Sequence, residues 1–305
     1  MASDVDIVSE NLIMHSRRIF LGSLGGLAIG CAASRMKSAP SRATPNPAVH
    51  EIESRVGGRV GLFAVATDSG KVLAHRADER FALCSTFKWV LAAAVLAEVD
   101  EHRLALEQAI AFGSADIVDH SPVTSNYVQQ GQMSVEQMAR AAVDNSDNTA
   151  ANLLLARVGG PLGLTTFLRS HGDEITRLDR NEPALNTNLP GDPRDTTSPR
   201  AMVGVLRSLL TTNALSVENR ERLIQWMASC KSGMLRLRSG LPADWRAADK
   251  TGSGDRGAAN DVVIAWPPNR GPVLVAAYLS DSSAPWEVLN AAHGEIGRLV
   301  ARELS

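Results

Sequence analysis

The apolar stretch RVGLFAVAT, with an alternation around Val60–Thr67, has the pattern of a β-strand. The turn signal Asp68-Ser69-Gly70 follows directly and predicts a hairpin whose second strand is KVLAHR. Strand patterns return near the C-terminus, in WRAADKTGSG, NDVVIAWPP and GPVLVAAYLSD, before a closing helix in PWEVLNAAHGEIGRLVARELS. Strands are therefore expected from both ends of the chain.

The middle of the chain has helical patterns. The stretch STFKWVLAAAVLAEVDEHRL, which begins at Ser85, is rich in alanine and leucine. SVEQMARAAVDNS opens with a capping box, NTAANLLLARVGG ends at paired glycines, SPRAMVGVLRSLLT has a proline in its first turn, and ENRERLIQWMAS is amphipathic. Between these helices, residues 177–195 are dense in Pro, Asn, Asp and Arg without a period. That composition predicts a long structured loop, and such loops are often functional.

Together these elements predict an α/β (α+β) fold. An antiparallel sheet is built from both chain ends and flanked by helices, an all-helical insertion packs beside it, and the active site lies in the cleft between. We expect a sheet domain of residues 48–84 and 229–305. The helical domain is expected at residues 85–228 and includes the loop at 177–195.

An export signal is expected before this fold. The segment MHSRRIFLGSLGGLAIGCAASRM combines paired arginines, a glycine-rich apolar stretch and small residues, and SRRIFLG within it resembles a twin-arginine signal. We expect residues 1–33 to form the signal, with Met14 as an alternative start, and residues 34–47 to form a linker. The expected localisation is the bacterial periplasm, reached through the twin-arginine export machinery. A lipid anchor on Cys31 is an alternative.

Charge and composition exclude several classes of protein. The 305 residues carry a formal net charge of −2 with acids and bases interspersed, so nucleic-acid binding has no support. No apolar run reaches the ~20 residues of a membrane-spanning helix. The seven histidines show no metal-ligand spacing, so neither a metal nor another cofactor is expected. Cys84 and Cys230 remain after the leader; an oxidising compartment permits a bridge between them, and two buried thiols are the expected state.

The chemistry is expected at Ser85 and Lys88, which lie three positions apart at the start of a predicted helix. Their side chains share a face, and an amine held near a serine hydroxyl can act as its base. Alone, this spacing also fits an ordinary helix start, and the segment SRMK repeats it within the expected leader and linker. Two further motifs follow in order: SDN at 146–148 in a polar break between helices, and KTG at 250–252 on a predicted strand.

S-x-x-K, S-D-N and K-T-G in this order are the signature of class A β-lactamases and penicillin-binding proteins. From about residue 48 to its end, the chain resembles a class A serine β-lactamase. Its LDRNEPALN segment looks like the omega loop of that family, which makes Glu182 and Asn186 the pair that positions the hydrolytic water. The resemblance also pairs Arg180 with Asp195 to close the loop. The alternative is that Glu182 is only a surface charge.

The resemblance implies the remaining roles. Ser85 is the nucleophile, and its backbone N–H forms the oxyanion hole with that of Ser253. Lys88 and Glu182 share the handling of protons in acylation, and Ser146 passes a proton to the lactam nitrogen. The residues expected to bind substrate are Asn148, Asn186, Lys250, Thr251, Gly252, Ser253, Arg236 and His120.

Three positions depart from the common pattern of the family. Many relatives have an arginine for the substrate carboxylate where this chain has Ala259, so Arg236 is expected to supply that charge; the alternative is a solvated arginine. His120 stands where relatives often place an aromatic gate, and an exposed loop histidine is the alternative. Some carbapenem-hydrolysing relatives bridge the position of Cys84 to the residue occupied here by Gly254, which excludes that bridge.

The expected function is therefore hydrolysis of penicillins or cephalosporins by a monomeric enzyme, conferring β-lactam resistance. A penicillin-binding D,D-peptidase is the alternative enzyme. A β-lactam sensor that acylates without turnover is the alternative from another class. Neither has a working base for deacylation, so Glu182 argues against both.

Overall fold

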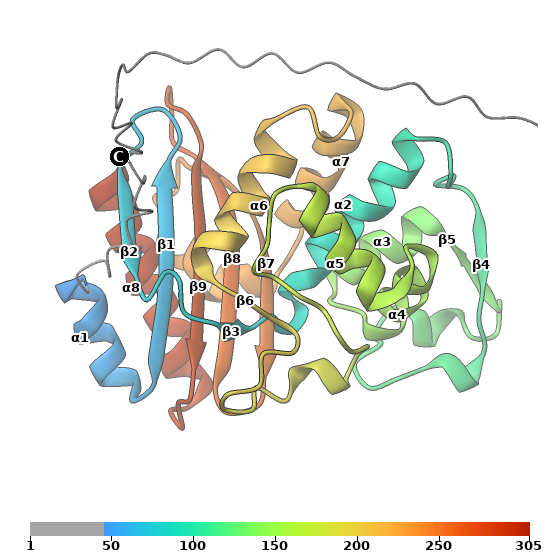
Figure 1. Cartoon of the computed structure of the whole chain (residues 1–305), viewed down its shortest axis with the longest axis horizontal. Helices are drawn as coiled ribbons and strands as arrows, with labels where there is room; N and C mark the ends of the chain where they lie inside the picture. Colours follow the sequence, from blue (N-terminus) through green and yellow to red (C-terminus); the bar gives the residue numbers. More distant parts are fainter. Residues whose placement is uncertain (1–45) are drawn as a thin grey trace, which may run out of the picture. The chain divides into compact units, whose positions relative to one another are not determined.

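The computed structural model describes residues 46–305, and the predicted leader, with Met14 and Cys31, lies outside the described residues. The helices of this part are α1 (Pro47–Val56), α2 (Phe87–Asp100), α3 (Val135–Asp144), α4 (Asn148–Arg157), α5 (Gly160–Ser170), α6 (Pro199–Thr211), α7 (Val217–Ala228) and α8 (Trp286–Leu304). The strands are β1 (Arg59–Ala66), β2 (Val72–His75), β3 (Phe81–Ala82), β4 (Ala109–Ala111), β5 (Gln132–Ser134), β6 (Thr196–Thr197), β7 (Arg246–Gly254), β8 (Ala258–Trp266) and β9 (Val273–Ser280). Figure 1 shows their arrangement.

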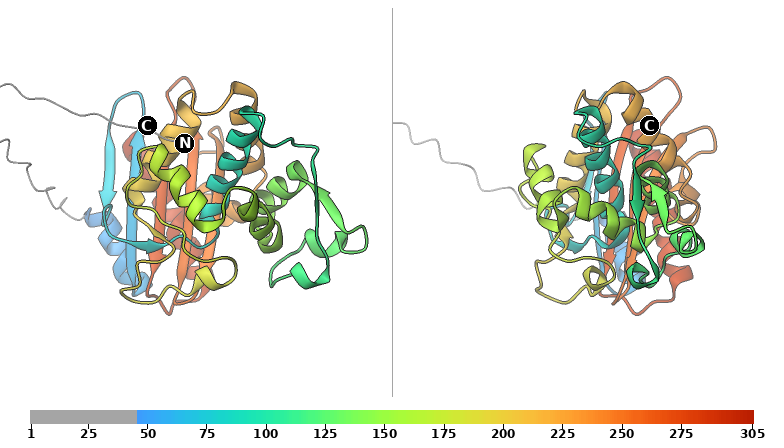
Figure 2. Two further views of the ribbon diagram at one scale, coloured as in Figure 1. Left: turned by 45° about the vertical axis from the view of Figure 1, so that its right-hand side comes forward. Right: turned by 90° about the vertical axis from the view of Figure 1, so that its right-hand side faces the viewer.

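The main sheet has five strands in the order β2-β1-β9-β8-β7, and every neighbouring pair is antiparallel. The first two strands in this order come from the N-terminal part of the chain and the other three from its C-terminal part. The prediction of an antiparallel sheet built from both ends is therefore confirmed. Strand β7 is the edge strand on the side of the helical segment that contains α3 and α4 (Figures 1 and 2).

The strand β1 is buried on both faces. Every residue after Arg59 is buried, with Leu62 and Ala64 in the core under α1 and α8, and Phe63 and Val65 in the core shared with the other helices. The period of two in the sequence thus separates two buried faces rather than a buried face from a wet one. A sheet covered on both sides is a rigid base for the cleft at its edge.

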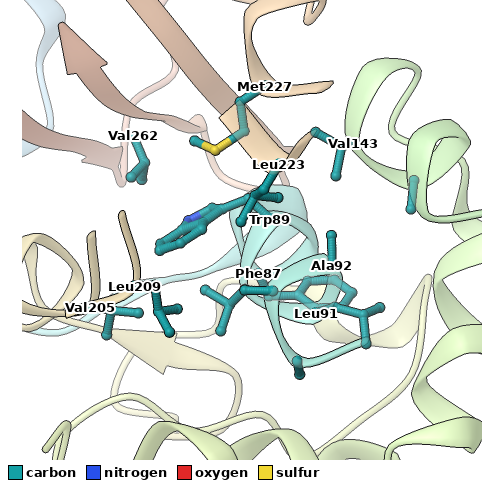
Figure 3. Packing of buried hydrophobic residues seen from close by; sticks show 14 of the residues in the cluster. Phe87, Trp89, Leu91, Ala92, Val143, Val205, Leu209, Leu223, Met227 and Val262 are labelled. Carbon is teal, nitrogen blue, oxygen red and sulfur yellow. The ribbon is translucent and has the colours of Figure 1, made fainter. Parts of the chain in front are cut away.

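The helix α2 runs through the centre of the larger core. Its first ten residues, Phe87–Leu96, are all buried. Figure 3 shows Phe87 and Trp89 of this helix surrounded by labelled side chains from α3, α6, α7 and β8. Lys88 lies within this buried run and is itself fully buried. Because a buried ammonium group is costly unless it is paired, its partners define the neighbouring site.

The sequence patterns did not predict two of the helices, α1 and α5. The paired glycines after NTAANLLLARVGG were expected only to end a helix, and α4 does end at Arg157, but α5 begins directly at Gly160. Gly159 and Gly160 both have positive φ angles, 85° and 70°, so the chain reverses within two residues. The other helix, α1, begins after Asn46, whose side chain accepts a hydrogen bond from Val49 N.

The loop at residues 177–195 contains only one short 3-10 helix, at Ala184–Asn186. Its ends are held together because Arg180 Nε donates to Asp195 Oδ2 at 2.6 Å, which confirms the expected pair. The division into a sheet domain and a helical domain stays a prediction. Helix α6 lies within the expected helical domain, yet it packs against β1, β8 and β9 as well as α7.

Candidate active site

Ser85 lies in a short 3-10 helix, Cys84–Thr86, immediately before α2. Cys84 has a φ of 44°, so the backbone turns sharply just before the serine and presents it at the cleft. The edge strand β7 touches this turn: a Cβ on Gly252 would lie 3.1 Å from Ser85 N. Only a glycine permits this close approach of the two backbones, which carry the N–H groups expected to form the oxyanion hole.

The hydroxyl of Ser85 donates to Glu182 Oε1 at 3.2 Å. Lys88 Nζ lies 3.0 Å from the same carboxylate oxygen, and both the lysine and the glutamate side chains are fully buried. Asn186 Nδ2 donates to the other oxygen, Oε2, at 2.5 Å. Glu182 is therefore not a surface charge; it is the group that connects the serine, the lysine and Asn186.

The three-residue spacing indicated a hydrogen bond between Ser85 and Lys88. In the described residues, the hydrogen bond of the Ser85 hydroxyl goes to Glu182 instead, while Lys88 Nζ donates to Ser146 O at 2.7 Å and to Asn148 Oδ1. Burial lowers the pKa of Lys88 to about 8, although the charge of Glu182 beside it raises that pKa. The lysine is thus hydrogen-bonded to the carbonyl and amide oxygens of the 146–148 turn, and Glu182 Oε1 is the atom that it shares with the serine.

Ser146 lies between two lysines. Its Oγ accepts from Lys250 Nζ at 3.2 Å and from Lys88 Nζ at 3.4 Å. A hydroxyl that accepts from two ammonium groups keeps its own hydrogen for a third partner. Asp147 is fully buried and fixes this turn, because its carboxylate accepts from Thr124 N at 2.9 Å and caps α4 through Ala150 N at 2.9 Å.

Asn148 connects this turn to the rim of the cleft. Its Nδ2 donates to Asp119 O at 2.8 Å, and its backbone N donates to His120 O at 3.0 Å. His120 has a φ of 60° and lines the cleft. One hydrogen of the Asn148 amide remains for a ligand, since Oδ1 and the other hydrogen are engaged by the protein.

The opposite wall of the cleft is strand β7. Lys250 is fully buried there, and burial lowers its pKa. Thr251, Gly252 and Ser253 follow it along the wall. The cleft between the walls has a volume of about 600 Å³, and it is lined by Ser85, Asp119, His120, Asp144, Asn145, Ser146, Asn148, Pro183, Asn186, Lys231, Ser232, Thr251, Gly252 and Ser253.

Arg236 lies behind β7 and is almost completely buried, so it is not the solvated charge of the alternative. Its guanidinium donates to the backbone oxygens of Gly252 at 2.6 Å and Asn260 at 2.7 Å, and to Ser253 Oγ at 2.7 Å. Because a guanidinium only donates, Ser253 Oγ accepts here and its own hydrogen is free for the cleft. Arg236 does not line the cleft itself, and it reaches the cleft through the hydroxyl of Ser253, which does.

Asn152 is a residue that the sequence patterns did not single out. Its Oδ1 accepts from Glu182 N and its Nδ2 donates to Glu182 O, both at 2.9 Å. Two hydrogen bonds from one amide fix the backbone of the glutamate onto α4. The signal that the sequence offers is its spacing, because Asn152 follows Asn148 by four positions and therefore lies on the same side of the predicted helix.

The two cysteines of residues 46–305 are buried, free thiols, as expected. A Cβ on Gly254 would lie 2.7 Å from Cys84 Sγ, so these two positions are indeed in contact and only the glycine prevents a bridge between them. Within residues 46–305, no group of three or more His, Cys, Asp or Glu side chains is arranged to hold a metal ion. In the same residues, no helix is long and apolar enough to cross a bilayer.

A serine hydroxyl that donates to a buried carboxylate, with a buried lysine on the same carboxylate oxygen, is the arrangement of an activated nucleophile and its base. The model of the β-lactamase enzyme family matches residues 45–304. Beta-lactamase AST-1 of Nocardia asteroides is 44% identical over 267 residues, which cover 88% of this chain and 86% of that protein.

Two solved structures agree with this match. An ancestral class A β-lactamase (GNCA) is 52% identical with a TM-score of 0.82, covering 83% of this chain and 97% of that chain. The putative class A β-lactamase PenP of Rhodopseudomonas palustris is 46% identical with a TM-score of 0.82, covering 83% and 97%. The chain belongs to the β-lactamase enzyme family. It is a class A serine β-lactamase, a hydrolase that acts on cyclic amides.

Proposed function

We propose that this enzyme hydrolyses the lactam amide of penicillins and cephalosporins through an acyl-enzyme on Ser85, and that this activity confers β-lactam resistance. The observation that carries the proposal is the position of Glu182, whose Oε1 contacts both Ser85 Oγ and Lys88 Nζ. One carboxylate is thereby within reach of the attacking hydroxyl and of a water that later attacks the ester.

In the acylation step, Ser85 Oγ attacks the lactam carbonyl and its proton passes to Glu182, the group to which it already donates. Lys88 stays positively charged and stabilises the carboxylate before the transfer. The backbone N–H groups of Ser85 and Ser253 bind the developing oxyanion. When the C–N bond breaks, Ser146 donates its hydrogen to the lactam nitrogen and is reprotonated from Lys88 or Lys250, both of which contact its Oγ.

Before deacylation, Glu182 passes the serine proton to Lys88, 3.0 Å away, which restores the charge that the two lysines gave up when Ser146 was reprotonated. In the deacylation step, the regenerated carboxylate of Glu182 takes a proton from water, the water oxygen attacks the ester, and Ser85 leaves with a proton returned by the glutamate. Asn186 supports this role in two ways. Its Nδ2 holds Glu182 Oε2, and its Oδ1 is buried without a hydrogen-bond partner among residues 46–305. Asn186 Oδ1 can therefore accept a hydrogen bond from a water beside Glu182, and that water would be in place to attack the ester.

Substrate recognition divides between the two walls of the cleft. Lys250, Thr251 and Ser253 bind the ring carboxylate, with Gly252 allowing β7 to lie close to the nucleophile and Arg236 orienting the Ser253 hydroxyl from behind. On the other wall, Asn148 binds the amide of the substrate side chain and His120 lies against the substrate at the rim.

A chromogenic cephalosporin tests the proposed function. Purified protein is mixed with an excess of the substrate, and release of the chromophore is followed past one equivalent. Sustained turnover is expected. A burst of one equivalent followed by no further release would instead identify a sensor or a slowly deacylating penicillin-binding protein.

The pH dependence of acylation follows from the pKa of Lys88, which burial lowers to about 8. We expect kcat/KM for a penicillin to fall as the pH rises through about 8, because deprotonation removes the charge that holds Glu182 and Ser146. This fall in kcat/KM is not caused by unfolding. The unfolded chain keeps the lysine proton up to a pKa near 10.5, so between about 8 and 10.5 this group makes the folded state more stable as pH rises. A kcat/KM that increases through this range, with circular dichroism unchanged, would mean that neutral Lys88 takes the serine proton.

Export belongs to the same proposal. The twin-arginine pattern in residues 1–33 supports export to the periplasm, the compartment in which β-lactams meet their targets. We also propose that the enzyme is a monomer with a sheet domain and a helical domain. Fractionation of cells that express the full chain, with and without a Lys-Lys replacement of Arg17 and Arg18, tests the export route.

A further inference from the structure

Ser232 lines the cleft on the same wall as Thr251, and the catalytic scheme gives it no role. Its Oγ lies 2.6 Å from Thr251 Oγ1, which is a close hydroxyl–hydroxyl hydrogen bond. Its Oγ also lies 3.3 Å from Cys230 Sγ. The three side chains therefore form a hydrogen-bonded row that begins at a buried thiol and ends at a hydroxyl in the cleft.

The segment that carries Ser232 is fixed against β7. A Cβ on Gly233 would lie 1.9 Å from Asp249 Oδ2, so the backbone at this glycine packs directly on the buried carboxyl group. Arg238 Nε lies 2.8 Å from Asp249 Oδ1, and its Nη2 donates to Cys230 O at 2.9 Å. The contact between Ser232 and Thr251 is thus held from both ends of the segment.

A bound carboxylate sets the direction of the hydrogen bonds in this row. A carboxylate only accepts, so Thr251 must give its single hydroxyl hydrogen to the ligand. Ser232 must then donate to Thr251 Oγ1, because one of two hydrogen-bonded hydroxyls has to be the donor. With the Ser232 hydrogen engaged, its oxygen accepts from the thiol of Cys230.

We propose that Ser232 is a positioning residue for recognition of the substrate's ring carboxylate, acting through Thr251, with the Cys230 thiol as the donor behind it. The inference rests on the proposed function, since it assumes that Thr251 meets that carboxylate. It extends the function because it adds an ordered donor to a site in which Ala259 takes the place of a cation and Arg236 is buried behind the strand.

The charge of Lys250 connects Cys230 to the same carboxylate subsite. Burial raises the pKa of its thiol, but the positive charge of Lys250 and a hydrogen bond from Ser232 lower it to a greater extent. A substrate carboxylate on Lys250 offsets that charge, and the hydrogen of Ser232 then goes to Thr251 rather than to sulfur, so both changes raise the pKa of the thiol and favour its donating form. Binding of the anion and protonation of the thiol therefore favour each other.

The test compares a penicillin with its methyl ester, which keeps the lactam ring but cannot present a carboxylate. For Ser232→Ala we expect kcat/KM for the acid to fall about five- to tenfold through KM, with kcat nearly unchanged, which is the size of one lost hydrogen bond. The ester should be affected less than about twofold. The ratio of acid to ester is the readout that a merely structural role of Ser232 does not move.

Four further variants complete the test. Ser229→Ala removes an exposed hydroxyl three positions away that bonds only along its own helix, to Gln225 O, and should leave both substrates unchanged. Ser232→Thr keeps a hydroxyl and should restore the ratio. Cys230→Ala should lower the ratio about two- to threefold, and Cys230→Ser should restore it.

An equal loss on acid and ester in Ser232→Ala, or no loss, overturns the proposal; an unchanged ratio in Cys230→Ala overturns the part that concerns the thiol. Turnover of the acid by the unaltered enzyme past one equivalent is measured first, because its absence contradicts the proposed function rather than this inference. In that event the same ratio is measured on the rate of Ser85 acylation by mass spectrometry, which tests the row of hydrogen bonds in either case.

Discussion

Glu182→Ala is expected to leave an enzyme that acylates and then stops, with deacylation slowed about 10²–10⁴-fold. The carboxylate is the group beside Ser85 that can take a proton from water, and Asn186 and Asn152 hold its side chain and backbone in place. Acylation should be slowed less. Without Glu182, Lys88 loses the partner that keeps its pKa near 8 against the effect of burial, so the neutral amine becomes available as a base.

Intact-protein mass spectrometry after mixing with a penicillin checks this expectation: the variant should carry one substrate mass on Ser85 for minutes or longer. Glu174→Ala is the matched control, because this glutamate is near the same loop but its side chain is largely exposed. That variant should show no stable adduct and the turnover of the unaltered enzyme. Sustained hydrolysis by Glu182→Ala would remove the glutamate from the deacylation step.

The sequence predicted which elements carry the motif residues, because each short motif occupies a separate element that the sheet and the core bring to one cleft; the roles of these residues stay predictions. Ser85, Ser146 and Lys250 come from the start of α2, the turn before α4 and the edge strand β7, and each motif fitted its expected element. The Arg180–Asp195 pair was also predicted from the resemblance, and the structure contains it. The sequence was therefore sufficient to predict which chemical groups are present and in which order the elements that bear them occur.

The contacts between these groups were harder to predict, because a spacing of three residues does not determine which hydrogen-bond partner each side chain has in the folded protein. Lys88 and Ser85 share a helix face, yet the buried amine is drawn to the oxygens of Ser146, Asn148 and Glu182. Arg236 gave a similar ambiguity: its charge suggested direct contact with a ligand, whereas in the structure it is buried behind β7 and donates to Ser253 Oγ. Such outcomes depend on side-chain packing that no periodicity encodes.

The shape of the 177–195 loop leads to the second large effect. Asp195 is fully buried, and its carboxylate accepts from the backbone N of Asp179 at 2.7 Å, from the backbone N of Arg180 at 2.9 Å and from the Arg180 guanidinium. Its backbone oxygen accepts from Leu83 N at 2.8 Å, two residues before the nucleophile. The same residue therefore closes the loop that carries Glu182 and ties it to the segment that carries Ser85.

Asp195→Asn is expected to lower the free energy of unfolding by about 2–4 kcal/mol, because it leaves the partly buried guanidinium of Arg180 without its counter-charge and one backbone N–H facing an amide. The expected kinetic signature is a fall in the deacylation rate that exceeds the fall in the acylation rate, since water activation depends on the exact place of Glu182 more than substrate binding does.

Urea unfolding and burst kinetics measure the two effects on one preparation. Asp192→Asn is the control within the same loop, because Asp192 pairs with Arg194 two residues away at the surface, and it should change neither quantity appreciably. If Asp195→Asn were as stable as the unaltered enzyme, the loop would be held by its backbone contacts alone. If it were destabilised but deacylated normally, closure of the loop would serve stability and Asn152 would be sufficient to place the glutamate.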